Sequence, residues 1–290
     1  MRTEQEMYDL ILKVANEDQR VRAVAINGSR ANKNAPKDIF QDYDIVYLVN
    51  DMASFLEEPN WVDVFGERVI MQTPDDSSLI QVESIGRYAY LMLFADGNRI
   101  DLTLIPINKQ DDYLQEDKLT KILLDKDGVL PRISSPTDQD YWVEKPTQDQ
   151  YLDCCNEFWW ISTYVAKGLW REEILYALDH LNRHGRPMLL KMFEWQVGTE
   201  RDFSVSVGKS YKYLEEFLSE EIWKRALVTF PEASYEKTWV ALFEMIELFR
   251  ETAKIVGDRL DFDYPTDWDQ RVTSYLKQVK HLPKNATDFK

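Results

Sequence analysis

The spacing of hydrophobic residues changes character about halfway along the chain. In the first 135 residues most apolar positions form short runs rich in β-branched and aromatic side chains, which are typical of strands. These runs lie at 21–26, 45–49, 68–72, 88–95 and 99–105, and Asp96-Gly97 between the last two indicates a hairpin. Positions 3–17 and 52–65 are typical of helices, and Gly66 ends the second one. This half of the chain predicts an α/β domain.

Beyond residue 130 the strand-like pattern disappears. The stretch 130–147 contains three prolines and little periodicity, so we interpret it as a linker. Apolar residues then recur at intervals of three and four from 152 to 169, which places one buried stripe on a helix. Further helices are predicted at 174–181, from Pro187 onward, and at 211–217, 221–227 and 235–256. We therefore predict an α+β protein, with an α/β domain and a mixed sheet in residues 1-135 and a helical bundle domain in residues 136-290.

One stretch, GSRANKNAPKDIFQDYD from Gly28 to Asp44, carries the strongest chemical signal. A Gly-Ser pair follows one predicted strand, and after a polar loop of twelve residues Asp42 and Asp44 stand at the head of the next. Residues i and i+2 of a strand project from the same face, so these two carboxylates would lie side by side. Adjacent carboxylates repel each other unless a cation lies between them, and oxygen ligands suit Mg²⁺, especially when substrate phosphates complete its shell.

The glycine and serine of this stretch suit a bound phosphate. Gly28 lets the backbone approach a ligand closely, because it has no side chain. The backbone N–H groups and the hydroxyl of Ser29 can then donate hydrogen bonds to phosphate oxygens. The pattern predicts that one loop holds phosphates and one strand holds a metal ion, although Gly-Ser and Asp-x-Asp also occur as solvated turns.

A third acid lies on a later predicted strand. In the run 99–105, Ile100, Leu102 and Leu104 fall on one face, while Asp101 and Thr103 fall on the other. An acid in the middle of so apolar a strand needs a partner or a metal ion. We therefore predict Asp101 as the third ligand.

Charge and composition restrict the class of partner. The chain of 290 residues has 35 basic and 51 acidic side chains, a net charge of −16. This balance argues against a nucleic-acid partner, because such binding depends on Lys and Arg contacts to phosphate. The same acidity would attract a polycationic substrate, although acidic surfaces also simply keep proteins in solution.

The sequence predicts a cytoplasmic protein without a membrane partner. Its content of 44% hydrophobic and 30% charged residues is that of a soluble globular protein. The chain has neither an apolar run near the ~20 residues needed to span a bilayer nor the apolar stretch of a signal peptide at its N-terminus. The adjacent Cys154 and Cys155 lie in a helical pattern, and we expect reduced core residues there.

The Gly-Ser pair, the twelve-residue gap, the Asp-x-Asp pair and the later acid resemble the polymerase-β-type nucleotidyltransferase superfamily. Within it, the chain as a whole is similar to the aminoglycoside 6-nucleotidyltransferases, the streptomycin adenylyltransferases of bacteria. The segments that carry this longer resemblance are GSRANKN, FQDYDI, DLTLIPI, LLDKD, DCCNEFWW, ILYALDHLN and VGKSYKYL. The resemblance covers nearly the whole chain and implies a nucleotidyltransferase domain followed by a helical domain.

The resemblance implies transfer of AMP from ATP to a hydroxyl of an aminoglycoside, the 6-hydroxyl of streptomycin, with pyrophosphate leaving. Ser29 and the adjacent backbone would hold the β- and γ-phosphates, and Arg30 would either assist with its charge or be structural. Asp42 and Asp44 would bind two Mg²⁺ ions. Asp101 would complete the second metal site or take the hydroxyl proton as general base, two roles that the sequence does not separate.

Two features of the helical half are candidates for binding. Lys209 and Lys212 stand in a largely acidic background, and the resemblance suggests one of them as a triphosphate contact; a solvated helix start is the alternative. Asp179 or Glu157 could bind a guanidinium or ammonium group of the substrate by a charge-assisted hydrogen bond. Structural bonding between the domains explains these acids equally well.

Two other functions are compatible with the residues. One is a nucleotidyltransferase that acts on a different acceptor, such as a lincosamide, a protein side chain or an RNA end, the last disfavoured by the acidity. The other is a non-catalytic module that binds nucleotide or a protein. Three facing acids argue against the second, since a binding module has no need of them.

Overall fold

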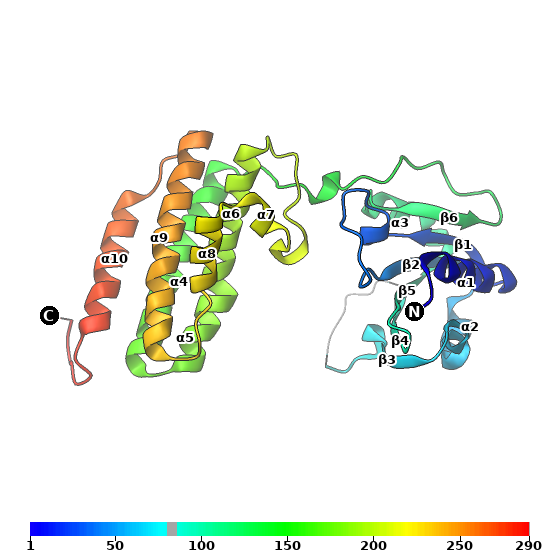
Figure 1. Cartoon of the computed structure of the whole chain (residues 1–290), viewed down its shortest axis with the longest axis horizontal. Helices are drawn as coiled ribbons and strands as arrows, with labels where there is room; N and C mark the ends of the chain where they lie inside the picture. Colours follow the sequence, from blue (N-terminus) through cyan, green and yellow to red (C-terminus); the bar gives the residue numbers. More distant parts are fainter. Residues whose placement is uncertain (80–85, 290) are drawn as a thin grey trace. The chain divides into compact units, whose positions relative to one another are not determined.

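The computed structural model describes residues 1–79 and 86–289. The chain divides into two compact units, Met1–Asp140 and Tyr141–Lys290, which we call the sheet unit and the helical unit (Figure 1). The strands belong to the first and a set of long helices to the second, so the predicted α+β class is confirmed. The division falls within the stretch 130–147 that we interpreted as a linker.

The sheet unit is built on a six-stranded mixed sheet. The strands run in the order β3-β4-β5-β2-β1-β6, and β2 pairs with β5 in parallel while the other neighbours are antiparallel. Their bounds are β1 Val21–Ile26, β2 Tyr43–Val49, β3 Arg68–Gln72, β4 Tyr88–Phe94, β5 Arg99–Pro106 and β6 Lys121–Asp125. The parallel pair aligns the starts of β2 and β5, which is the arrangement on which the site depends.

Alternating side chains of the strands form a separate core on each face of the sheet. In β1, Val24 and Ile26 belong to the cluster that includes Met7 and Ile11 of helix α1 (Glu4–Glu17). Ala23 and Ala25 belong to the cluster on the other face, with helix α3 (Gln110–Glu116). Helix α1 begins with a capping box in which Thr3 and Glu6 bond each other's backbone N–H, an arrangement that favours a helix start at this position. The sheet is thus covered on both faces.

The prediction of a single helix over 52–65 is wrong, because the segment is divided in two. The segment forms helix α2 (Met52–Glu57) and a separate 3₁₀ helix, η2 (Pro59–Phe65). Pro59 explains the break, because a proline disfavours helical backbone in the residue before it. Glu58 accordingly has φ −118° and ψ 65°. Gly66 ends the segment as predicted, with a φ of 121°.

The helical unit packs around one large apolar cluster. The stripe predicted for helix α4 (Gln148–Arg171) is buried, and Phe158 within it stacks on Phe249 with ring centroids 3.8 Å apart. Cys154 and Cys155 are buried and free, as expected, and burial raises the pKa of the Cys154 thiol to about 12. The other main helices are α5 Ile174–His180, α6 Arg186–Glu200, α7 Leu214–Phe217, α8 Glu220–Val228, α9 Tyr235–Leu260 and α10 Thr266–His281.

The helix predicted from Pro187 onward is confirmed as α6, which begins at Arg186 with the proline in its first turn. It follows α5 through a π-helical turn, η6 (Leu181–Gly185), in which the Arg186 N–H bonds the Leu181 carbonyl. Helix α10 was not predicted at all. Most of its surface is polar, and Leu276 and Val279 are its buried apolar residues, so its hydrophobic signal is weak.

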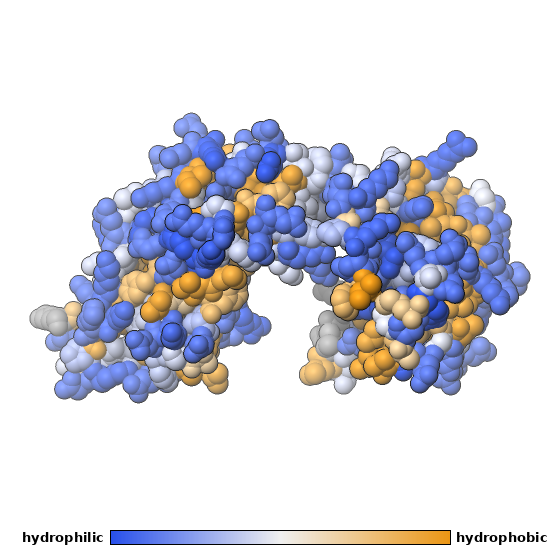
Figure 2. Space-filling model, viewed as in Figure 1, coloured by the Kyte–Doolittle hydropathy of each residue, from blue (hydrophilic) through white to orange (hydrophobic). Residues whose placement is uncertain are grey.

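The surface agrees with the charged composition. Figure 2 shows hydrophilic residues over most of the visible face of each unit, with smaller hydrophobic areas between them. Among the described residues, no helix combines the length and the apolar character that crossing a membrane requires.

Candidate active site

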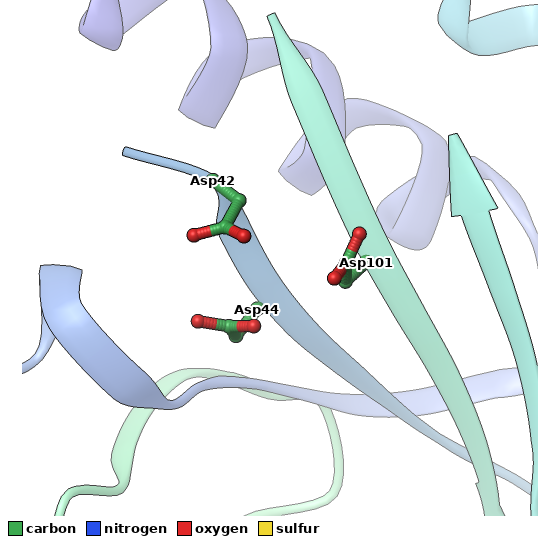
Figure 3. A group of neighbouring side chains, drawn as sticks. All are labelled: Asp42, Asp44 and Asp101. Atoms are coloured by element: carbon green, nitrogen blue, oxygen red, sulfur yellow. The ribbon is translucent and has the colours of Figure 1, made fainter. Parts of the chain in front are cut away.

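Three carboxylates converge at the start of the parallel strand pair. Asp42 immediately precedes β2, Asp44 lies within β2, and Asp101 lies within β5 directly opposite Asp44 in the register. Each offers one oxygen atom, and the three atoms lie within 4.8 Å of one another. Figure 3 shows the side chains turned toward a common space from the two neighbouring strands. The structure therefore brings together the three acids that strand alternation singled out.

The donor set suits a hard divalent cation. Mg²⁺ and similar ions prefer oxygen ligands, and they are commonly bound by one or a few carboxylates together with phosphates of a substrate. Asp42, Asp44 and Asp101 are all partly buried, so part of each carboxylate remains accessible to an incoming ligand. Their mutual repulsion in one space favours a bound positive charge.

The Gly-Ser turn lies directly against this cluster. Gly28 begins the short 3₁₀ turn η1 (Gly28–Arg30) with a φ of +66°, a conformation that other residues rarely adopt. A Cβ atom at Gly28 would lie 2.2 Å from Oδ2 of Asp44, so no other residue fits there without movement of the carboxylate. The N–H of Asn27 donates to the Asp44 carbonyl at 2.9 Å, which ties the turn to β2. Ser29 follows Gly28 in the same turn.

A network of polar side chains holds Asn27, the residue immediately before the turn. Asn27 Nδ2 donates to Thr120 Oγ1 at 2.6 Å, and the Tyr113 hydroxyl donates to Asn27 Oδ1 at 2.6 Å. Thr120 in turn donates to the Asp117 carbonyl at 2.7 Å. Thr120 and Tyr113 are almost completely buried, and this burial raises the pKa of the Tyr113 phenol. Sequence reasoning missed these residues, because no local pattern links positions so far apart in the chain.

Arg30 makes the contacts of a structural residue. Its Nε donates to the Asp42 carbonyl at 3.0 Å and its Nη2 to the Gln41 carbonyl at 2.8 Å. The guanidinium also lies 3.7 Å above the ring of Tyr43 and 3.4 Å from Oε1 of Glu4. Its side chain is only 9% exposed. These contacts fix the segment that carries Asp42, and a phosphate contact of Arg30 stays a prediction.

Arg99 is a site residue that sequence reasoning missed. Its Nε and Nη2 donate to the two carboxylate oxygens of Asp101 at 2.7 and 2.6 Å. Its Nε also lies 3.8 Å from Oδ2 of Asp42. The hydrogen bonds that Arg99 donates to Asp101 and the negative charges of Asp101, Asp42 and Asp44 raise the pKa of Arg99. The signal was present, since Arg99 stands two residues before Asp101 on the same strand face.

The two candidate lysines lie in an unusual turn of the helical unit. Lys209 and Lys212 are exposed and flank Ser210 and Tyr211, whose φ values of 57° and 62° are left-handed. A 3₁₀ turn (η7, Lys209–Tyr211) therefore replaces the start of the helix expected over 211–217, and α7 begins only at Leu214. Such backbone conformations are costly and are found more often at functional sites than elsewhere.

The two candidate acids of the helical unit are exposed. Asp179 in α5 accepts from Nη1 of Arg183 at 3.4 Å, and Glu157 lies on the surface of α4. One helical turn beyond Glu157, Trp160 is 57% exposed and donates from Nε1 to the Tyr164 hydroxyl at 3.1 Å. The Tyr164 ring contacts His180 edge to face, with centroids 5.4 Å apart. An aromatic cluster that is exposed at Trp160 thus connects the two helices that carry the acids.

Comparisons with known proteins identify the family of this chain. Residues 1–279 match the family model described as streptomycin adenylyltransferase. The chain is 45% identical over 280 residues to the aminoglycoside 6-adenylyltransferase of Bacillus subtilis (strain 168), covering 96% of this chain and 98% of that relative. It is also 45% identical over 280 residues to the aminoglycoside 6-adenylyltransferase of Campylobacter jejuni, covering 97% and 96% of the two chains.

A solved structure, the crystal structure of an aminoglycoside 6-adenyltransferase from Bacillus subtilis, is 41% identical in sequence. The match covers 97% of this chain and 100% of that chain, with a TM-score of 0.49. The family model and the curated relatives span nearly the whole sequence, including both units. The chain therefore belongs to the streptomycin adenylyltransferase family of nucleotidyltransferases.

Proposed function

We propose that the protein transfers AMP from MgATP to a hydroxyl of an aminoglycoside, the 6-hydroxyl of streptomycin, and releases pyrophosphate. The observation that carries the proposal is the convergence of Asp42, Asp44 and Asp101 beside the Gly28 turn. Membership of the family supports the reaction, and the names of the curated relatives support an aminoglycoside acceptor.

The carboxylates would hold Mg²⁺ at the reacting phosphate. Mg²⁺ held there would supply positive charge to the phosphate oxygens and would lower the pKa of the attacking hydroxyl. Asp44 and Asp101 face each other across the parallel strand pair, so both reach the same space without rearrangement of the backbone. Such preorganised charge is the usual origin of large rate effects in active sites.

The turn would bind the phosphates, and Asp101 would act as a metal ligand or as the general base. The N–H groups of the turn and the hydroxyl of Ser29 bind phosphate oxygens and orient the nucleotide. As the acceptor oxygen bonds to the α-phosphorus, the bond from that phosphorus to the bridging oxygen breaks and pyrophosphate leaves. Asp101 acts as a ligand or accepts the hydroxyl proton, and in the structure both of its carboxylate oxygens accept hydrogen bonds from Arg99.

The helical unit supplies chemistry suited to a cationic, sugar-containing acceptor. Glu157 and Asp179 are exposed carboxylates that can accept hydrogen bonds from guanidinium or ammonium groups. The exposed ring of Trp160 offers a face for a sugar ring or a cation. The net charge of −16 steers such a molecule toward the protein. Lys209 and Lys212 remain the candidates for a triphosphate contact.

Pyrophosphate release tests the proposal. MgATP is incubated with the protein and streptomycin, spectinomycin, kanamycin, lincomycin or no acceptor. Release with streptomycin alone supports the proposed acceptor, and release with lincomycin alone indicates a different acceptor class. Absence of release with all of them, while MgATP still binds in a calorimetric titration, favours a different acceptor or a non-catalytic nucleotide-binding module.

A further inference from the structure

Arg99 is bound to the carboxylate cluster in a way that Arg30 is not. Strand alternation places Arg99 and Asp101 on one face of β5, and the pairing of β2 with β5 brings Asp42 to the same place. The guanidinium of Arg99 donates to both carboxylate oxygens of Asp101, and its Nε lies 3.8 Å from Asp42. Arg30, by contrast, donates to backbone carbonyls and contacts none of the three carboxylates by a hydrogen bond.

The contacts of Arg99 use the oxygens that a metal ion would use. A carboxylate has a limited number of acceptor directions, and a bidentate guanidinium occupies one on each oxygen. A divalent cation at the cluster also repels the positive charge of Arg99. The arginine and the cation therefore compete for Asp101.

Arg99 is also able to leave. Its side chain is 47% exposed, whereas that of Arg30 is 9% exposed and held by several contacts. A guanidinium displaced from a carboxylate needs another planar anionic partner, and a phosphate group matches its geometry. In the proposed reaction the anion that arrives with the cation is a nucleotide triphosphate.

We propose that Arg99 is an internal counter-ion of the carboxylate cluster, which competes with the divalent cation for Asp101 and, once displaced, binds the phosphates of the nucleotide. Each of the two ligands then favours binding of the other, because the nucleotide phosphates give the displaced Arg99 a new partner. The inference rests on the proposed function for the identity of the cation and the nucleotide. It makes Arg99 a nucleotide-binding residue that couples the binding of the two.

The first test measures binding of Mn²⁺ alone, by electron paramagnetic resonance and without nucleotide. Arg99→Met should bind Mn²⁺ about tenfold more tightly than the wild type, because the competing charge is gone. Arg99→Lys, which keeps the charge but loses the bidentate geometry, should fall between them. The matched control is Arg22→Met, which removes another bidentate arginine, paired with Asp127, and should leave Mn²⁺ affinity unchanged.

The second test measures ATP affinity by calorimetry at saturating Mg²⁺ without acceptor. Arg99→Met should bind ATP about tenfold more weakly, since a phosphate contact is lost. The two affinities thus change in opposite directions. A merely structural arginine would not produce this pattern, because damage to the site weakens both ligands together.

The outcomes separate the inference from the proposed function. If Mn²⁺ binds to the wild type, binds poorly to Asp44→Asn, and binds equally to Arg99→Met and wild type, the role of Arg99 is overturned and the cation site stands. Tighter Mn²⁺ binding with unchanged ATP affinity overturns the phosphate contact. If no Mn²⁺ binds to any form, the cation site of the proposed function fails, and the inference fails with it.

Discussion

The two units present their candidate residues in different ways. In the sheet unit, Asp42, Asp44 and Asp101 are fixed by paired strands, and their oxygens lie within 4.8 Å of one another. In the helical unit, Lys209 and Glu157 are exposed single side chains on a turn and a helix surface. Side chains that the fold holds in place before the ligand binds can stabilise the transition state without rearrangement, whereas exposed single side chains contribute mainly to ligand affinity. We therefore expect substitutions of the three carboxylates to change the rate, and substitutions of Lys209 or Glu157 to change affinity.

The largest effect is expected for Asp44→Asn. Loss of one carboxylate of the cluster should lower transfer of AMP by roughly a hundredfold or more, since charge stabilisation at such sites is usually worth that much. The fold should persist, because removal of one of three neighbouring negative charges relieves repulsion. Steady-state kinetics and the melting temperature check both points. The control Asp63→Asn removes an exposed acid paired with Arg68, and near-normal turnover of Asp44→Asn itself would contradict the metal assignment.

Substitution within a buried arginine–aspartate pair of the helical unit should lower the stability and leave the activity unchanged. Arg250 donates to both oxygens of Asp269, which is 4% exposed, so Asp269→Asn should lower the free energy of unfolding by about 3 kcal/mol. Transfer of AMP by the folded protein should be unchanged. A large loss of activity in the folded variant would contradict this purely structural role.

The same pair predicts a pH dependence of stability. Burial alone would raise the pKa of Asp269, but hydrogen bonds from Arg250 and Tyr264 leave it below the ordinary value. Its contribution is therefore present above about pH 4, near the unfolded pKa, and is lost as the pH falls through the lower folded pKa. Chemical denaturation of wild type and Asp269→Asn should give a free-energy difference that shrinks in this acid range.

Gly28→Ala tests how tightly the turn and the cluster fit. Both Gly28 and Gly128 have left-handed φ values, +66° and +65°, but only at Gly28 would a Cβ atom meet a carboxylate. Each alanine variant should lose about 1 kcal/mol of stability from the strained backbone. Only Gly28→Ala should also lose activity, by roughly tenfold or more, through displacement of Asp44. Equal kinetics of the two variants would show that the close approach has no catalytic importance.

The smallest effect is expected in the helical unit. Lys209→Met should raise KM for ATP about threefold with little change in kcat, since an exposed charge contributes modestly to binding. The control Lys224→Met removes an exposed lysine of α8 that pairs with Glu220. An unchanged KM would leave Lys209 as a solvated residue of the turn.

The sheet unit was predictable because its signals are local. Alternation within a strand determines which face a side chain occupies, and that rule alone placed Asp42 beside Asp44 and isolated Asp101 on a polar face. The parallel pairing of β2 with β5, which brings these acids together, joins strands that are far apart in the sequence, and no local pattern predicted it. The same rule would have found Arg99 had its position two residues from Asp101 been considered.

The residues that escaped prediction depend on contacts between distant segments. Asn27 meets Tyr113 and Thr120 only after β1, α3 and the start of β6 have packed together. The π-helical turn at Leu181–Gly185, which joins α5 to α6, has no distinct sequence period. Helix α10 has few buried apolar residues to give a stripe. In each case tertiary packing, rather than local pattern, determines the structure.

The most direct test of the central claim is the mass of streptomycin after incubation with MgATP and either the wild type or Asp44→Asn at equal concentration. We predict that the wild type converts the antibiotic to a species heavier by one AMP group, while Asp44→Asn leaves it largely unmodified over the same time. Unmodified streptomycin with the wild type, or equal conversion by both proteins, would contradict nucleotidyl transfer at the carboxylate cluster.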